Sequence, residues 1–147
     1  MNDMTTIEGK ILIIRGQQVM LDRDLAGLYG VETKNINKAM SRNKERFPIN
    51  FCFQLTTDEF ASLRFQNGTS NKKGDRRYLP FVFTEQGVAM LSTVLSSDIA
   101  IEISLKIMDA FVSMRKFILS NAQVSIDRRR NQESFKVKIF DLERTWS

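Results

Sequence analysis

Residues 22–44 carry the apolar spacing of amphipathic helices, and this spacing is interrupted once, at Gly30. Ala26 supplies a small side chain where two helices can cross, and Gly30 tolerates the positive φ of a tight turn. Apolar Val31 and Ile36 can hold a second helix on the first. The segment therefore predicts a helix-turn-helix, although the same pattern also arises by chance in helical proteins.

The solvent face of the second predicted helix, residues 33–44, is basic and rich in amides. If Ile36 points inward, a step of about 100° per residue turns Ala39, Met40 and Asn43 inward with it. The outward and flanking side chains are then Lys34, Asn35, Asn37, Lys38, Ser41 and Arg42. Asn pairs with adenine and Arg with guanine, whereas Lys and Ser suit phosphates, so this face can read duplex DNA. Charge alone is more typical of a plain solvated helix face.

Positive charge is concentrated in two places. Residues 34–46 hold five positive charges and one negative, with Lys44 and Arg46 at the end of the segment. A loop rich in turn-forming residues holds a second patch, made of Lys72, Lys73, Arg76 and Arg77. If the strands on either side of this loop pair, the loop can act as a wing that grips the phosphate backbone or the minor groove. A solvated loop is the alternative.

The rest of the chain predicts small antiparallel strands and C-terminal helices around a winged-helix-like core, and hence an α+β fold class. Two β-rich runs lie on either side of residues 15–17, which indicates a short N-terminal hairpin. Phe51, Phe53 and Leu55 alternate on one face of a strand, and the run "YLPFVF" forms another.

Three helix starts are indicated after the first strands. Thr56 and Glu59 have the spacing of a capping box, and Thr84 can cap the helix that follows the second apolar strand. The longest helix is expected to begin near Ser97 or Asp98. Its inward face is predicted to consist of Ile99, Ile103, Ile107, Phe111, Met114 and Ile118.

The composition shifts to polar residues after Leu119, which divides the chain into a domain over residues 9–119 and a helical tail over residues 120–147. Apolar residues recur in the tail at helical spacing, at Phe135, Ile139, Leu142 and Trp146. This short stripe suits either an oligomerising helix or a frayed amphipathic end. We expect the tail to contribute association of copies and little to folding.

The composition excludes several classes of site. The chain has 22 Lys and Arg against 17 Asp and Glu, a net charge of +5, which favours an anionic partner. It has no His, so His-based catalysis and His-ligated zinc are excluded. The lone Cys52, between Phe51 and Phe53, is expected to be buried and unreactive. We predict no metal and no cofactor.

The sequence also indicates a cytoplasmic location. The first ten residues lack the basic region and apolar run of a signal peptide, and we expect none. The longest uncharged part of the apolar C-terminal half, residues 86–97, is too short to span a bilayer, so we expect no membrane association.

Two long stretches, "VMLDRDLAGLYGVETKNINKAMSRNKERFPINFCFQLT" and "RRYLPFVFTEQGVAMLSTVLSSDIAIEISLKIMDAF", resemble the halves of the phage ORF-six N-terminal domain, which is related to the KilA-N and Bro-N domains. The resemblance covers residues 11–116 in unbroken order. It implies a DNA-binding protein without catalysis, of the antirepressor or transcriptional-regulator type found in phages and prophages. Many relatives carry a C-terminal effector domain, whereas only residues 120–147 follow Leu119 here, so the resemblance does not indicate the biological output.

The resemblance also implies which residues face DNA. They are Thr33, Lys34, Asn35, Asn37, Lys38, Arg42, Asn43, Lys44 and Arg46, with Arg76 and Arg77 in the loop. The runs "RFP" and "FTEQG" match family signatures as well, and for these a capped turn and a strand-to-helix junction explain the residues as well as a function does.

Two other functions fit parts of the sequence. Glu32-Thr33-Lys34 with Asp22 and Asp24 superficially matches the acidic motif of metal-dependent nucleases, although Glu32 would lie in a turn and the motif is short. The domain could instead be a protein-interaction module that binds a repressor, with a basic helix that is incidental.

Overall fold

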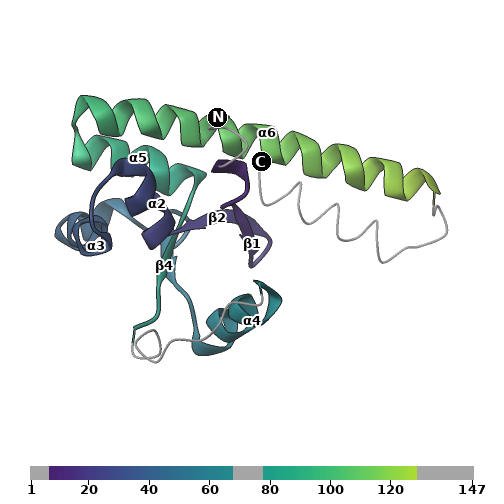
Figure 1. The fold of residues 1–147 in the computed structure, drawn as a ribbon, viewed down its shortest axis with the longest axis horizontal. Coiled ribbons are helices and arrows are strands. Elements are labelled where there is room, and N and C mark those ends of the chain that lie inside the picture. Colours follow the sequence, from purple (N-terminus) through teal and green to yellow (C-terminus); the bar gives the residue numbers. More distant parts are fainter. Residues whose placement is uncertain (1–6, 68–77, 129–147) are drawn as a thin grey trace.

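The computed structural model describes residues 7–67 and 78–128, and its α+β architecture confirms the predicted fold class (Figure 1). The strands are β1 (Leu12–Ile14), β2 (Gln17–Leu21), β3 (Cys52–Gln54) and β4 (Phe81–Thr84). The helices are α2 (Asp22–Tyr29), α3 (Thr33–Arg42), the 3-10 turn η1 (Lys44–Arg46), α4 (Thr57–Asn67), α5 (Glu85–Leu95) and α6 (Asp98–Arg128). The strands form one antiparallel sheet in the order β1-β2-β4-β3.

Both faces of the sheet are covered by helices. Met20 and Phe83 point into a large core shared with α2, α3, α5 and α6. Their strand neighbours Val19 and Val82 point to the opposite face, where Phe60 and Leu63 of α4 complete a smaller core. Figure 1 shows α4 on one side of the sheet and α5 with α6 on the other. Strands buried on both faces explain why their sequences are nearly continuous apolar runs.

Strand β3 is shorter than the sequence predicts. Phe53 and Leu55 share the smaller core as expected, but Phe51 packs against the larger core. The expectation that Phe51 lies on the same face was wrong because the strand begins only at Cys52, and the Phe51 N–H bonds to the Pro48 carbonyl in the preceding turn at 2.8 Å. Cys52 is 7% exposed, and burial raises the pKa of its thiol to about 12. A thiol with a raised pKa forms little of the reactive thiolate, which agrees with the predicted lack of reactivity.

The N-terminal hairpin is confirmed. Ile14 pairs with Gln17, so the turn consists of Arg15 and Gly16 alone, and both have positive φ, 57° and 76°. This is the sign expected of the tight turns that match strand twist. The strands flanking the basic loop also pair, with Phe53 opposite Val82. The loop itself, residues 68–77, lies outside the described residues, so the wing stays a prediction.

Helices α2 and α3 form the predicted hairpin around Gly30. Gly30 has φ 76° and donates its N–H to the Ala26 carbonyl at 2.9 Å, which ends α2 in a left-handed cap. Ile36 and Met40 are buried and hold α3 on the core. Val31 does not, contrary to expectation: it is 39% exposed because it belongs to the turn and not to the apolar face of α3.

The predicted capping box of α4 is present. Glu59 accepts a bond from the Thr56 N–H at 2.8 Å, and the Glu59 N–H donates to Thr56 Oγ1 at 3.1 Å. Arg15 of the hairpin turn forms a bidentate ion pair with Glu59: its Nε donates to Oε2 at 2.7 Å and its Nη2 to Oε1 at 3.0 Å. The Arg15 guanidinium also lies 4.0 Å from the centre of the Phe53 ring. The turn between β1 and β2 is thereby fastened to α4.

We predict that Glu59→Gln lowers the free energy of unfolding at pH 7 by about 1 kcal/mol, because Gln keeps the cap but loses the ion pair. The hydrogen bonds from Arg15 lower the pKa of Glu59 from 4.5 to about 2. The stability that the charge contributes is therefore complete above pH 4.5 and is lost as the pH falls toward 2. Urea titrations from pH 7 to pH 2 should show the two proteins converging, whereas a constant difference would contradict the assignment. Exposed Glu45→Gln is the control.

The C-terminal helices start where predicted but one inward residue was wrongly assigned. Thr84 Oγ1 caps α5 by accepting the Gly87 N–H at 3.2 Å, and Ser97 Oγ caps α6 by accepting the Ala100 N–H at 3.0 Å. Ile99 is 63% exposed instead of buried, because in the first part of α6 the side chains that face the core are Ala100 and Ser104. Ile107 and Phe111 are fully buried, as expected, and Ile103, Met114 and Ile118 are half-buried.

Helix α6 continues to Arg128, past the predicted domain boundary at Leu119. The apolar series of the tail, residues 135–146, lies outside the described residues. Among the helices described, none combines the length and hydropathy that crossing a bilayer requires.

Candidate nucleic-acid interface

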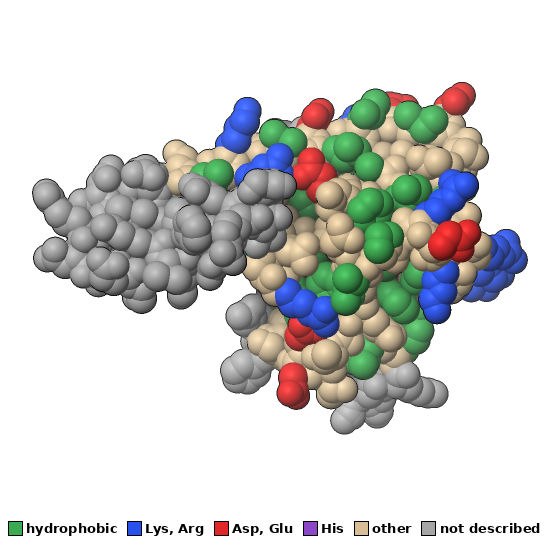
Figure 2. Space-filling view, turned by 180° about the vertical axis from the view of Figure 1, so that it is seen from behind, with side chains coloured by type: hydrophobic (Ala, Val, Ile, Leu, Met, Phe, Trp, Pro, Cys, Tyr) green, Lys and Arg blue, Asp and Glu red, His purple; other side chains and the backbone are tan. Residues whose placement is uncertain are grey.

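The outer face of α3 is a continuous basic and polar surface. Its exposed side chains are Lys34, Lys38, Ser41 and Arg42, which helical geometry turns outward, and Asn35, which it places on the flank. Lys44 and Arg46 of η1 extend it and are exposed as well. Figure 2 shows Lys and Arg side chains gathered at the right-hand edge of the molecule, where α3 lies when seen from behind. The structure therefore leaves all seven of these predicted residues exposed, along α3 and the adjoining η1.

The charges of this surface are available to a partner. Lys34 Nζ lies 3.5 Å from Glu32 Oε1, but both side chains are more than two-thirds exposed, at 73% and 72%. An ion pair in that environment is weak and is easily exchanged for a phosphate. Thr33, the first residue of α3, is half-buried, and Glu32 before it has no side-chain bond that caps the helix. The start of α3 thus presents N–H groups that its own N-cap side chain does not satisfy.

Asn37 is engaged inside the protein, which the sequence did not indicate. Its Nδ2 donates to Asp22 Oδ2 at 3.0 Å and to the Tyr78 hydroxyl at 2.7 Å. The same Asp22 oxygen accepts the Phe81 N–H at 3.1 Å, and Asp22 is only 1% exposed. This Asp22 network joins α2, α3 and the start of β4. Asn37 therefore fixes how α3 sits on the sheet.

Asn43 also bonds within the protein. Its Nδ2 donates to the Ala39 carbonyl at 2.8 Å, where α3 ends, and the Asn43 N–H donates to the Met40 carbonyl at 3.1 Å. Asn43 is half-buried, in agreement with its predicted inward position. It shapes the passage from α3 into η1, which carries Lys44 and Arg46.

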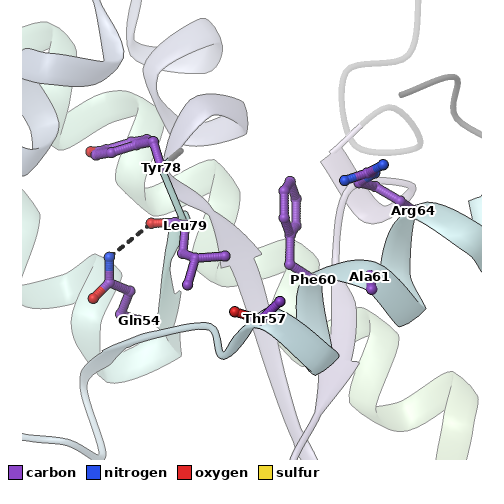
Figure 3. Close-up of a pocket in the computed structure, with 7 residues that line it drawn as sticks. All are labelled: Gln54, Thr57, Phe60, Ala61, Arg64, Tyr78 and Leu79. Carbon is purple, nitrogen blue, oxygen red and sulfur yellow. Dashed lines mark hydrogen bonds between the residues drawn. The ribbon is translucent and has the colours of Figure 1, made fainter. Parts of the chain in front are cut away.

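A groove with a volume of about 650 Å³ adjoins this region, between α4 and the ends of β3 and β4. Its lining is Gln54, Thr57, Phe60, Ala61, Arg64, Tyr78 and Leu79. In Figure 3, Phe60 and Leu79 stand in the middle, with Tyr78 at one end and Arg64 at the other. The Arg64 guanidinium lies 5.5 Å from the centre of the Phe60 ring. The Tyr78 hydroxyl also accepts a hydrogen bond from Asn37 of α3, so Tyr78 links the groove to this helix.

The second basic patch cannot be placed against α3. Lys72, Lys73, Arg76 and Arg77 all lie outside the described residues. Their proposed contact with a phosphate backbone stays a prediction, and the surface defined by the structure is that of α3 and η1.

The acidic residues of the nuclease motif are not gathered into a site. Glu32 is exposed in the turn before α3, whereas Asp22 is buried and bonded to Asn37 and Phe81. Burial raises the pKa of nearby Asp24. Within residues 7–67 and 78–128, no three Asp, Glu, Cys or His side chains lie close enough to share a metal ion. The geometry of these residues gives the nuclease reading no support.

The comparison with family models agrees with the resemblance seen in the sequence. The model of the ORF6N domain matches residues 9–94, more than half of the 147 residues and the whole segment from β1 into α5. Comparisons with curated proteins and with solved structures gave no match. The matched segment includes α2, α3 and the complete four-stranded sheet. The chain therefore belongs to the ORF6N domain family.

Proposed function

We propose that the protein binds double-stranded DNA as a phage or prophage regulator, either a transcriptional regulator or an antirepressor, with α3 in the major groove. The observation that carries this proposal is the exposed face of α3, where Lys34, Lys38, Ser41 and Arg42 point outward over a helix anchored by buried Ile36. A helix of this size fits the major groove, and its partner α2 takes the place of the first helix of a helix-turn-helix.

The side chains divide into two roles. Arg42 and Asn35 are exposed and can bond to guanine and adenine edges, whereas Lys34 and Lys38 suit phosphates. Both donors of the Asn37 amide are already used by Asp22 and Tyr78. We therefore assign Asn37 the role of positioning α3, in place of the base contact that the sequence suggested.

We predict separable effects of Arg42→Ala and Lys38→Ala on DNA binding. Arg42→Ala should weaken binding to the preferred duplex by about 1 to 3 kcal/mol and relax the preference at one or two base pairs. Lys38→Ala should weaken binding to all duplexes and reduce the salt slope by about one unit. The measurement is a set of binding isotherms at several salt concentrations, after selection of the preferred site from random DNA.

The matched control is Lys10→Ala, which removes the same charge from the segment before β1. If the α3 variants bind like the parent while folded, α3 is not the reading element. A parent protein that binds no duplex even at low salt would point to a protein-interaction module instead. Magnesium-dependent cleavage of plasmid would revive the nuclease reading, against our proposal that the protein is not an enzyme.

A further inference from the structure

Helix α6 carries a second apolar stripe beside its core-facing side, and of this stripe Met108 also packs against the large core. The core side of α6 contains Ala100, Ser104, Ile107 and Phe111. A separate stripe runs along the helix at spacings of four, three, four and seven residues, through Ile101, Leu105, Met108, Val112 and Leu119. Ile101 is 46% exposed and Leu105 59%. In Figure 2, hydrophobic side chains reach the surface in the upper part of the molecule, where α6 runs.

The stripe has the spacing of a coiled-coil seam. Alternating steps of four and three residues are the a and d positions of a heptad, and Arg115 occupies the position between Val112 and Leu119. A surface helix in a monomer needs only one apolar face. A second one in heptad register, exposed at Ile101 and Leu105 and half-buried at Met108, Val112 and Leu119, is what a helix needs to pack against another helix.

We propose that the stripe is the seam of a homodimer, in which α6 packs antiparallel against α6 of a second copy. An antiparallel register centred near Ala110 sets each apolar residue of the seam opposite a suitable partner. Ile101 meets Leu119 of the second copy, and Met108 meets Val112. Leu105 meets the aliphatic stem of Arg115, whose guanidinium is already bonded to Glu85 at 2.8 Å.

The charges beside the seam single out a second copy as the occupant. Glu102, Asp109 and Lys116 follow one another at heptad spacing along one edge of the stripe and are all exposed. In the antiparallel register Glu102 lies opposite Lys116 of the second copy, and the two-fold axis repeats this pair. Asp109 lies opposite Asp109 of the second copy near the two-fold axis, and the repulsion between these two carboxylates is the one unfavourable contact. The surface is otherwise complementary to itself.

This dimer is independent of the proposed DNA binding, since α5 lies between α3 and α6 in the fold (Figure 1). It leaves α3 of both copies uncovered. A two-fold dimer that does bind DNA would read inverted half-sites.

The test is analytical ultracentrifugation of the full chain and its variants over a range of concentrations. The parent should dimerise, and Leu105→Glu should weaken association at least about 100-fold, because it buries two charges in the seam. Ile99→Glu is the control: Ile99 is as exposed on the same helix but lies outside the stripe, and its variant should dimerise normally. Circular dichroism confirms that each variant is folded.

The charged residues test the register. Lys116→Glu and Glu102→Lys should each weaken the dimer about tenfold, and combining them should restore it to within about threefold, because the pairs are exchanged. Asp109→Asn should tighten it. A full chain that stays monomeric at every concentration would overturn the proposal, and is the result expected if residues 129–147 cover the stripe. Dimerisation that Leu105→Glu does not affect, or a double variant that is not restored, would overturn this seam and register.

Discussion

Replacing Gly87 with Ala will lower the free energy of unfolding by about 3 kcal/mol, because the fold has no space for a methyl group there. A Cβ built on Gly87 would overlap the carbonyl oxygen of Phe51. That oxygen is part of the main chain and accepts the Thr84 N–H at 3.0 Å, so it cannot move without weakening the bond between the turn before β3 and the end of β4. The "FTEQG" signature is thereby explained structurally: Thr84 caps α5, and Gly87 lets its first turn approach the preceding chain.

Gly27→Ala is the matched control. Gly27 also lies within a helix, α2, but a Cβ there would have no heavy atom within 4 Å. It should leave stability unchanged or raise it by up to about 1 kcal/mol, because Ala favours helices more than Gly does. Urea unfolding of both variants compares them directly. Equal stabilities of the two variants would show that α5 can shift away from Phe51.

Local signals in the sequence predicted the starts and ends of the helices well. The capping pair of Thr56 and Glu59, the cap at Thr84 and the break at Gly30 each depend on residues a few positions apart. Interactions of that range are fixed by the sequence itself. The same holds for the outward face of α3, since one buried residue, Ile36, sets the direction of every other side chain on a helix.

The side of α6 that faces the core was predicted correctly except at the start of the helix. Its sequence has two apolar stripes, one through Ile107 and Phe111 and another through Ile101 and Leu105. Periodicity shows that both exist, and the longer series through Ile107 and Phe111 was correctly assigned to the core. The exposed Ile99 belongs to neither, and it was assigned inward only because it lies eight residues before Ile107.

The hydrogen bonds that hold α3 on the sheet could not be predicted from the sequence. Asn37 looks like any other amide on a polar helix face, and its partners Asp22 and Tyr78 are far from it along the chain. Only the packing of α2, α3 and β4 brings them together. The basic surface could thus be predicted from composition and helical geometry. The fold was needed to separate the exposed residues proposed to contact DNA from Asn37, which is bonded inside the protein.

Asp22→Ala is expected to cost about 3 kcal/mol of unfolding free energy, because it removes the buried carboxylate that accepts hydrogen bonds from two partly buried donors. These donors are the Asn37 amide and the Phe81 N–H, both bonded to Asp22 Oδ2. The substitution also removes an acidic side chain from the first turn of α2, where a negative charge favours the helix dipole. Because Asp22 holds Asn37, the same variant should loosen α3 on the sheet and weaken the proposed DNA binding beyond its effect on stability.

Two further variants separate these effects. Asp22→Asn keeps an oxygen for the two partly buried donors and should cost only about 1 kcal/mol, the difference between a charged and a neutral acceptor. Asp98→Ala removes an exposed carboxylate from the first turn of α6 and should cost less than about 1 kcal/mol, the dipole contribution alone. Thermal unfolding ranks the stabilities of the three variants. Hydrogen exchange of the backbone amides of α3 reports how firmly α3 is held on the sheet. If Asp22→Ala were no more harmful than Asp98→Ala, and the α3 amides stayed protected, the Asp22 network would not be what holds α3 in place.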